Sequence, residues 1–170
     1  MDSILITVWR HGKAGSAPRD ADRALTTRGR DDVSRGAAAL AHTCGRRGVV
    51  PPDALWFSRW RRTRETAGII VEGLDLSVSE SAEVLIPGAS PDAVENSLVT
   101  LWERGTPPAH LVLVSHQPLV SALVDRWLGS PGVAPSLPPG GLVTLELASP
   151  TQGAGRLCWW AFPPLFEASA

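Results

Sequence analysis

An uncharged apolar run near the amino terminus, Ile4–Trp9, constrains the fold most strongly. The run is short and mostly β-branched, which is typical of a strand buried on both faces of a parallel sheet. It ends abruptly at Arg10, His11 and Gly12, and the glycine lets the backbone turn sharply or approach a ligand. Ligands of open α/β sheets bind at the carboxyl ends of the strands. We therefore expect an α/β fold with a site for an anionic, phosphorylated ligand at Arg10 and His11.

Two further short apolar runs end in similar residues. One, residues 54–58, ends in Ser58 and leads into an arginine-rich helix. The other, residues 110–115, ends directly before His116. If these strands are parallel to the first, their carboxyl ends meet at one edge of the sheet. Two imidazoles and several guanidiniums would then converge on one point.

The remaining pattern predicts helices on both faces of a mostly parallel central sheet. Apolar residues recur at helical spacing in several segments between the strands. Thr26 or Thr27 is suited to cap the first helix, and the segment from Gly45 is suited to end it. We expect a three-layer α/β/α arrangement in one domain, residues 1–170. The expected helices cover residues 27–43, 59–71, 92–103 and 118–127, and two closing strands cover residues 142–147 and 156–162.

The charges are nearly balanced overall but unevenly distributed. Residues 1–64 hold thirteen of the sixteen basic residues and only six acidic ones. Nearly all the cations are arginine, the side chain best suited to bidentate phosphate contacts. A nucleic-acid partner would require a continuous basic stripe with a recognition motif. Neither is evident, so we expect no nucleic-acid binding.

The sequence also bears on compartment and metal binding. No apolar run approaches the roughly 20 residues that span a bilayer. No basic region precedes the first apolar run, as it would in a secretory signal. Cys44 and Cys158 are far apart and lack metal-ligand spacing. We therefore expect a cytoplasmic protein with two buried thiols and no membrane partner.

Four segments, in this order, resemble the histidine phosphatase superfamily, which is marked by an Arg-His-Gly signature. Residues 10–12 match the signature, and residues 23–29 resemble the Leu-Thr-x-x-Gly helix entry of the family. Residues 58–67 resemble its Ser-Pro-x-x-Arg-x-x-Gln-Thr-Ala segment, and residues 115–118 resemble the segment with its second histidine. The small size and the absence of a large inserted cap are most similar to SixA-type phosphohistidine phosphatases. The resemblance implies a phosphoglycerate mutase-like fold and phosphatase activity without metal or cofactor.

The resemblance also implies a role for each matching residue. His11 would attack phosphorus through a neutral ring nitrogen, and water would then hydrolyse the phosphohistidine intermediate. Arg10, Arg62 and a protonated His116 would hold the non-bridging oxygens, where charge sits in the transition state. Further candidates for substrate binding are Arg23, Lys13, Ser58 and Gln117. For Arg23 the alternative is a surface ion pair with Asp20 or Asp22.

The sequence departs from the family pattern at several positions. Arg59 replaces the usual proline, and Glu65 stands where glutamine is common. Some members carry a general acid directly after the second histidine, but that position is Gln117 here. Glu83 is the remaining candidate for a general acid, and a simple surface position is the alternative for it.

The substrate expectation follows from the leaving group. An imidazole departs readily from a phosphoramidate, so such a substrate needs a general acid less than a sugar phosphate does. We therefore expect dephosphorylation of phosphohistidine on a protein domain. Two alternatives remain open: a small-molecule phosphomonoesterase of broad specificity, and a phosphate-binding module without catalysis.

Overall fold

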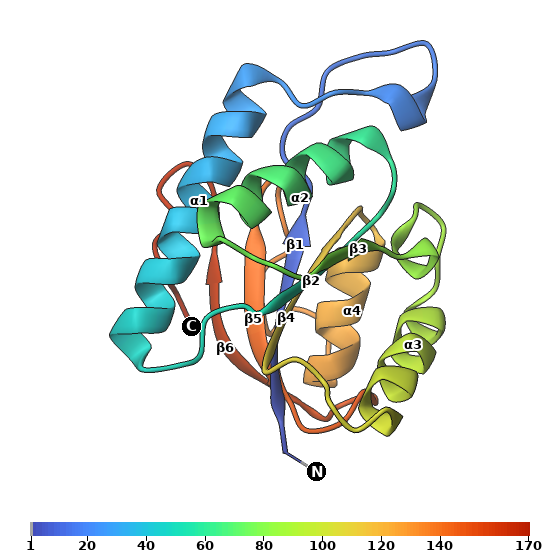
Figure 1. The fold of residues 1–170 in the computed structure, drawn as a ribbon, viewed down its shortest axis with the longest axis vertical. Coiled ribbons are helices and arrows are strands. Elements are labelled where there is room, and N and C mark those ends of the chain that lie inside the picture. Colours follow the sequence, from blue (N-terminus) through green and yellow to red (C-terminus); the bar gives the residue numbers. More distant parts are fainter. Residues whose placement is uncertain (1) are drawn as a thin grey trace.

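A computed structural model describes residues 2–170 of the chain. Within them, six strands form one sheet in the order β3-β2-β4-β1-β5-β6 (Figure 1). The strands are β1 (Ile4–Arg10), β2 (Ala54–Phe57), β3 (Ser79–Ser81), β4 (His110–Ser115), β5 (Leu142–Leu147) and β6 (Gly155–Ala161). The helices are α1 (Thr27–Arg47), α2 (Arg61–Leu74), α3 (Pro91–Glu103) and α4 (Leu119–Leu128), with short 3-10 turns η1 (Asp20–Asp22) and η2 (Glu83–Leu85).

The sheet is mostly parallel, as the sequence predicts. Strand β4 pairs in parallel with both β1 and β2, and β2 pairs in parallel with β3. The last two strands run antiparallel, β5 beside β1 and β6 beside β5, which confirms the closing hairpin. Arg10 lies opposite Ser115, and Phe57 lies opposite Val114. The carboxyl ends of β1, β2 and β4 therefore meet at one edge of the sheet.

Helices cover both faces of this sheet, which confirms the three-layer α/β/α arrangement. Helices α1 and α2 lie together on one face, and α3 and α4 lie on the other (Figure 1). Alternate residues of the buried strands supply the two cores. Toward α1 and α2 the sheet presents Trp9, Leu55, Val112 and Val114, and toward α3 and α4 it presents Ile6, Val8, Leu111 and Leu113.

The helix bounds differ from the prediction by one to four residues, most at the end of α1 and around α2, which extends to Leu74. Helix α1 begins after Thr26, whose hydroxyl accepts a hydrogen bond from the Gly29 amide (3.0 Å). It continues through Gly45 and ends at Gly48, which adopts a left-handed conformation (φ 64°). Gly48 is thus the C-terminal stop, because glycine takes this conformation without a steric penalty. Helix α2 begins at Arg61, since Trp60 has an extended backbone (ψ 149°).

Glycine is required where the loop after β1 crosses the start of α1. A Cβ built on Gly12 would lie 2.8 Å from the carbonyl oxygen of Gly29. A Cβ on Gly29 would lie only 2.2 Å from the carbonyl oxygen of Lys13. Gly12 therefore permits close packing of two backbone segments against each other. This contact fixes the position of the residues that follow β1.

No helix within residues 2–170 is both long enough and apolar enough to cross a membrane. Cys44 and Cys158 are free thiols; Cys44 is buried against the sheet as expected, whereas Cys158 is only partly buried.

Candidate active site

Three strand ends bring the predicted site residues together. His11 directly follows β1, and its amide donates a hydrogen bond to the carbonyl oxygen of Ser115 (3.1 Å). His116 directly follows β4, and Ser58 directly follows β2. The ring centroids of His11 and His116 lie 5.3 Å apart, with the ring planes inclined at 59°. The two imidazoles thus face one another at the carboxyl edge of the sheet.

The hydrogen bonds of His11 determine its tautomer. Nδ1 lies 2.8 Å from the carbonyl oxygen of Gly12, which can only accept. Nε2 lies 3.2 Å from Nε of Arg62, which can only donate. The ring proton is therefore on Nδ1, and the lone pair on Nε2 accepts the hydrogen bond from Arg62. A neutral imidazole oriented in this way is a nucleophile.

Burial keeps both imidazoles neutral. His11 is only 8% exposed, and desolvation lowers its pKa to about 4, helped by the charges of Arg62, Arg10 and Arg23. Desolvation likewise lowers the pKa of His116 to about 3, and His11, Arg62 and Arg10 lower it further. The sequence-based expectation of a protonated His116 therefore does not describe the substrate-free protein, in which the charged form is disfavoured by burial.

His116 is held from two sides. Its Nε2 lies 2.8 Å from the Ser58 hydroxyl, and the Trp60 ring packs edge-on against it with centroids 5.6 Å apart. Its Nδ1 is buried and has no hydrogen-bond partner among the described residues. A buried polar nitrogen without a partner is unfavourable. His116 thus offers a nitrogen that an oxygen of a ligand could satisfy.

Arg62 is the buried cation of the site. It is 5% exposed and uses all three of its nitrogens. Its Nε donates to His11, Nη1 donates to the backbone oxygen of Asp20 (2.7 Å), and Nη2 donates to the Asp20 carboxylate (3.3 Å). Arg10 donates from Nη1 to the carbonyl oxygen of Leu137 (3.1 Å), and its buried Nε has no partner in the described chain.

Asp20 is a site residue that sequence reasoning missed. Its carboxylate accepts hydrogen bonds from Arg23 (3.0 Å) and Arg62 (3.3 Å), and both arginines lower its pKa, Arg23 most. Arg23 therefore makes the ion pair considered as its alternative, yet its charge also acts on His11. The only sequence signal for a role of Asp20 is its position in a turn, three residues before Arg23.

Comparison with known proteins shows the family. No family model and no curated protein sequence matches the chain. Among solved structures, the protein histidine phosphatase SixA complexed with tungstate has 28% identity and a TM-score of 0.79, covering 94% of this chain and 97% of that one. This chain belongs to the histidine phosphatase superfamily. As a phosphatase of this superfamily it is a hydrolase, and its Arg10-His11-Gly12 segment stands at the strand end where the site is assembled.

Two other members of the histidine phosphatase superfamily share the fold. A candidate phosphohistidine phosphatase SixA from Agrobacterium tumefaciens is 23% identical over 94% of this chain and 99% of its own, with a TM-score of 0.71. The mycobacterial glucosyl-3-phosphoglycerate phosphatase is 17% identical over 91% of this chain and 97% of its own, with a TM-score of 0.68. The superfamily fold thus includes enzymes named for different substrates.

The side chains of the remaining predicted residues make no hydrogen bond to either imidazole among residues 2–170 of this histidine phosphatase. The Gln117 amide hydrogen-bonds Ser121, Ser136 and the carbonyl oxygen of Leu137, so it holds the loop that also binds Arg10. The side chain of Lys13 is exposed. Glu83 is 69% exposed and forms an ion pair with Arg59 (2.7 Å). It therefore occupies a surface position, which was the alternative to a general acid.

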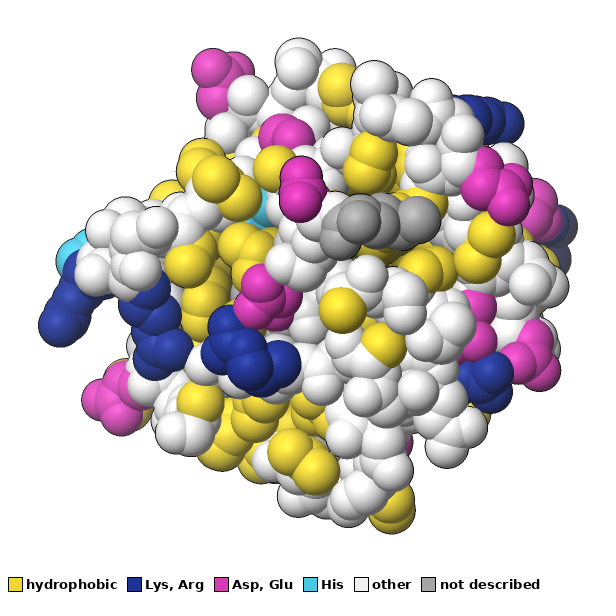
Figure 2. All heavy atoms as spheres, turned by 90° about the horizontal axis from the view of Figure 1, so that it is seen from below, with side chains coloured by type: hydrophobic (Ala, Val, Ile, Leu, Met, Phe, Trp, Pro, Cys, Tyr) yellow, Lys and Arg dark blue, Asp and Glu magenta, His cyan; other side chains and the backbone are white. Residues whose placement is uncertain are grey.

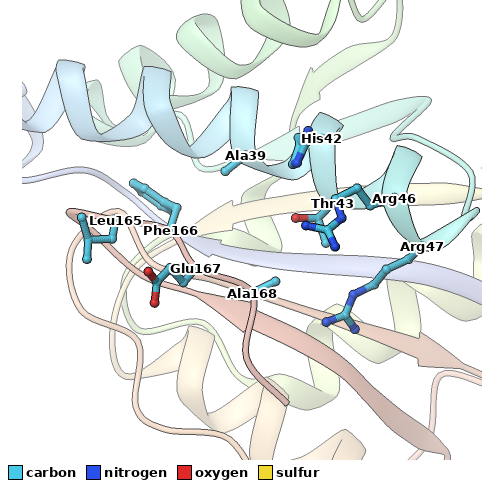
Figure 3. Close-up of a pocket in the computed structure, with 9 residues that line it drawn as sticks. All are labelled: Ala39, His42, Thr43, Arg46, Arg47, Leu165, Phe166, Glu167 and Ala168. Atoms are coloured by element: carbon cyan, nitrogen blue, oxygen red, sulfur yellow. The ribbon is translucent and has the colours of Figure 1, made fainter.

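Another cavity lies outside the histidine phosphatase site. It has a volume of about 530 Å³ and lies between the end of α1 and the C-terminal segment (Figure 3). His42 and Arg46 line it from α1, and Glu167 lines it from the other side. None of the predicted site residues contributes to it. Residues 2–170 also contain no group of three or more His, Cys, Asp or Glu placed to hold a metal ion.

We expect the site histidines to make the protein less stable in acid. Their pKa values are about 4 and 3 when folded and 6.5 ordinarily, so the unfolded chain binds more protons below pH 6.5. The free energy of unfolding therefore falls as the pH drops from 6.5 toward 4. NMR titration of the ring signals should show His11 and His116 protonating only below about pH 5. A midpoint near 6.5 for His11 would contradict the buried, neutral imidazole.

Proposed function

We propose that this chain removes the phosphoryl group from phosphohistidine carried on a protein, through a covalent intermediate on His11. The observation that carries the proposal is the orientation of His11. Its Nδ1 proton is held by the Gly12 carbonyl oxygen, and its Nε2 lone pair lies beside the Arg62 guanidinium. An uncharged nucleophile beside a fixed cation suits attack on a phosphoryl group, because the cation attracts the phosphoryl oxygens toward the nucleophilic nitrogen.

The reaction has two displacements at phosphorus. In the first, the substrate phosphohistidine carries a proton on its other ring nitrogen; Nε2 of His11 forms a bond to phosphorus while the P–N bond of the substrate breaks, and the substrate histidine leaves as neutral imidazole. In the second, water attacks phosphorus and the bond to His11 breaks. Both protons of the water leave with inorganic phosphate as dihydrogen phosphate, and the Nε2 lone pair is restored. Dividing one difficult hydrolysis into two transfers is the advantage of a nucleophilic catalyst.

Arg10, Arg62 and His116 would bind the phosphoryl oxygens. The partnerless Nε of Arg10 and the partnerless Nδ1 of His116 are donors that the described chain leaves unused. Arg62 already lies within hydrogen-bond distance of the nucleophilic nitrogen. A bound dianion would raise the pKa of His116 and favour its protonated form. The expected imidazolium thus belongs to the substrate complex.

The carboxylates near the site support phosphohistidine as the substrate. Arg23 and Arg62 lower the pKa of Asp20, so it is ionised and has no proton to give. Glu83 is paired with Arg59 at the surface. A sugar phosphate needs a proton on its departing alkoxide, whereas imidazole departs from phosphorus as a stable neutral base. The similarity to proteins named SixA agrees with this choice.

A second candidate function is hydrolysis of small phosphate esters. The glucosyl-3-phosphoglycerate phosphatase, which shares the fold, is named for such a substrate. In that case the general acid would have to be supplied by the substrate or by solvent.

Turnover measured on matched substrates separates the two functions. We expect kcat/KM for a protein phosphorylated on histidine to exceed that for sugar phosphates, and p-nitrophenyl phosphate with its good leaving group to fall between them. Preference for sugar phosphates would overturn the proposal. Binding of phosphate without turnover of any of the three would indicate the non-catalytic module.

A further inference from the structure

A cationic cavity adjoins the candidate active site. It has a volume of about 550 Å³ and is lined by Arg19 and Asp22 from the loop before α1, and by Arg59, Trp60, Arg61 and Arg64 from the start of α2. We refer to Arg19, Arg59, Arg61 and Arg64 as the arginine rim. None of these four side chains takes part in the hydrogen bonds of His11 or His116. The positive charges of the arginine rim therefore have no part in the proposed phosphoryl transfer.

Trp60 connects the cavity to the reacting groups. Its ring contacts His116 edge-on, with centroids 5.6 Å apart. The guanidinium carbon of Arg62 lies 5.0 Å from the centroid of the same ring. Trp60 is thus a wall shared by the cavity and the phosphoryl site. A molecule that presents a phosphoryl group to His11 would lie against the rim with its neighbouring atoms.

The rim cations are available to a partner. Arg19 pairs with Asp22, Arg59 pairs with Glu83 and Arg61 pairs with Glu65, and these three arginine side chains are 79%, 60% and 51% exposed. The pairs of Arg19 and Arg59 are exposed on both sides and therefore weak, so a carboxylate of a partner can replace the internal one. Glu65, the partner of Arg61, is largely buried at 13% exposure. Glu65 is also shared with Arg30. Arg64 has no ion pair with any of residues 2–170.

The opposite end of the molecule has a different charge pattern. Figure 2 shows that face, where basic and acidic side chains are interspersed with hydrophobic ones. The cavity at the end that holds the site is instead lined by four arginines and a single acid, Asp22. An anionic partner would be attracted to this end in preference to the other.

We propose that the arginine rim docks the acidic surface around the phosphohistidine of a substrate protein. This inference rests on the proposed function. The cations come from two separate segments and extend into solvent, an arrangement that fits carboxylates spread over a protein surface. A second phosphate of a small molecule would instead favour buried, convergent donors. Arg61 and Arg64 lie on the same helix as Arg62, so docking would place the phosphoryl group toward His11.

Two peptides with one phosphohistidine each provide the test. In one, Asp and Glu flank the histidine; in the other, Asn and Gln occupy the same positions. Free phosphohistidine is the third substrate. We expect the native chain to hydrolyse the acidic peptide with a kcat/KM about tenfold above that of the neutral one, mainly through a lower KM, since a few exposed ion pairs supply about this factor. The preference should decline as salt is added.

Variants assign the preference to the rim. The double variant R61A/R64A should lose most of the preference through a higher KM for the acidic peptide, while turnover of free phosphohistidine stays the same. The matched control is R104A, at the end of α3 near the start of β4 and so at the far edge of the sheet. Equal kcat/KM for the two peptides, or an unchanged preference in R61A/R64A, would overturn the docking proposal. Failure to hydrolyse any phosphohistidine would instead overturn the proposed function.

Discussion

Replacing His11 with alanine is expected to lower kcat/KM by at least about a thousandfold, because it removes the nucleophile itself. The substitution should also abolish ³²P labelling of the protein by a phosphohistidine substrate quenched during turnover. The fold should persist, since alanine removes only the imidazole and keeps the backbone hydrogen bonds of residue 11 to Ser115 and Gly140. Circular dichroism and the thermal midpoint would verify this.

His42→Ala is the matched control for that experiment. His42 is an exposed histidine of α1 that lines the cavity away from the site, so its loss should leave activity and labelling unchanged. Retention of acid-labile ³²P in His11→Ala would assign the phosphoenzyme to another residue, with His116 the nearest imidazole.

Replacing Arg62 with lysine should lower kcat/KM by about a hundredfold or more, close to the effect of alanine, because removal of one aligned transition-state donor has an effect of this size. Lysine keeps the charge but offers one ammonium in place of the planar fork that reaches His11 and Asp20 together. In the native chain the charge of Arg62 lowers the pKa of His11. Removing the guanidinium with Arg62→Ala should therefore raise that pKa.

The pKa change distinguishes a direct role of Arg62 from a structural one. The midpoint of the His11 titration, followed by NMR, should shift to higher pH in Arg62→Ala. In Arg104→Ala the midpoint should stay unchanged. Activity within threefold of the native chain in Arg62→Lys would contradict the assignment, because charge alone would then be sufficient.

The fold was predictable because its strands are strongly patterned. The runs that end at Arg10, Ser58 and His116 are buried, and their parallel pairing follows from the helices that connect them. The Arg-His-Gly segment was likewise visible in the sequence, whereas the choice of Arg62 among four neighbouring arginines came from the family resemblance and not from spacing. The strands and the Arg-His-Gly segment depend on local pattern and on chain order, which a single sequence contains.

Other features depend on contacts between distant segments and were not predictable. Asp20 binds Arg62 across 42 positions, and its loop has no periodic pattern. The start of α2 was expected two residues too early, because the basic run conceals the extended backbone at Trp60. Gln117 was expected at the substrate, yet its amide bonds to the loop before β5, whose path the sequence does not indicate.

A single hydroxyl joins two segments of the site. Thr66 accepts a hydrogen bond from the Gly12 amide (3.1 Å) and donates one to the Arg62 carbonyl oxygen (2.7 Å). The turn after β1 and the first turn of α2 are therefore tied together before any ligand arrives. Folding itself brings His11 and Arg62 together. The backbone around them therefore needs no further ordering when substrate binds. Such a preorganised centre can act on a phosphoryl group as soon as the group binds.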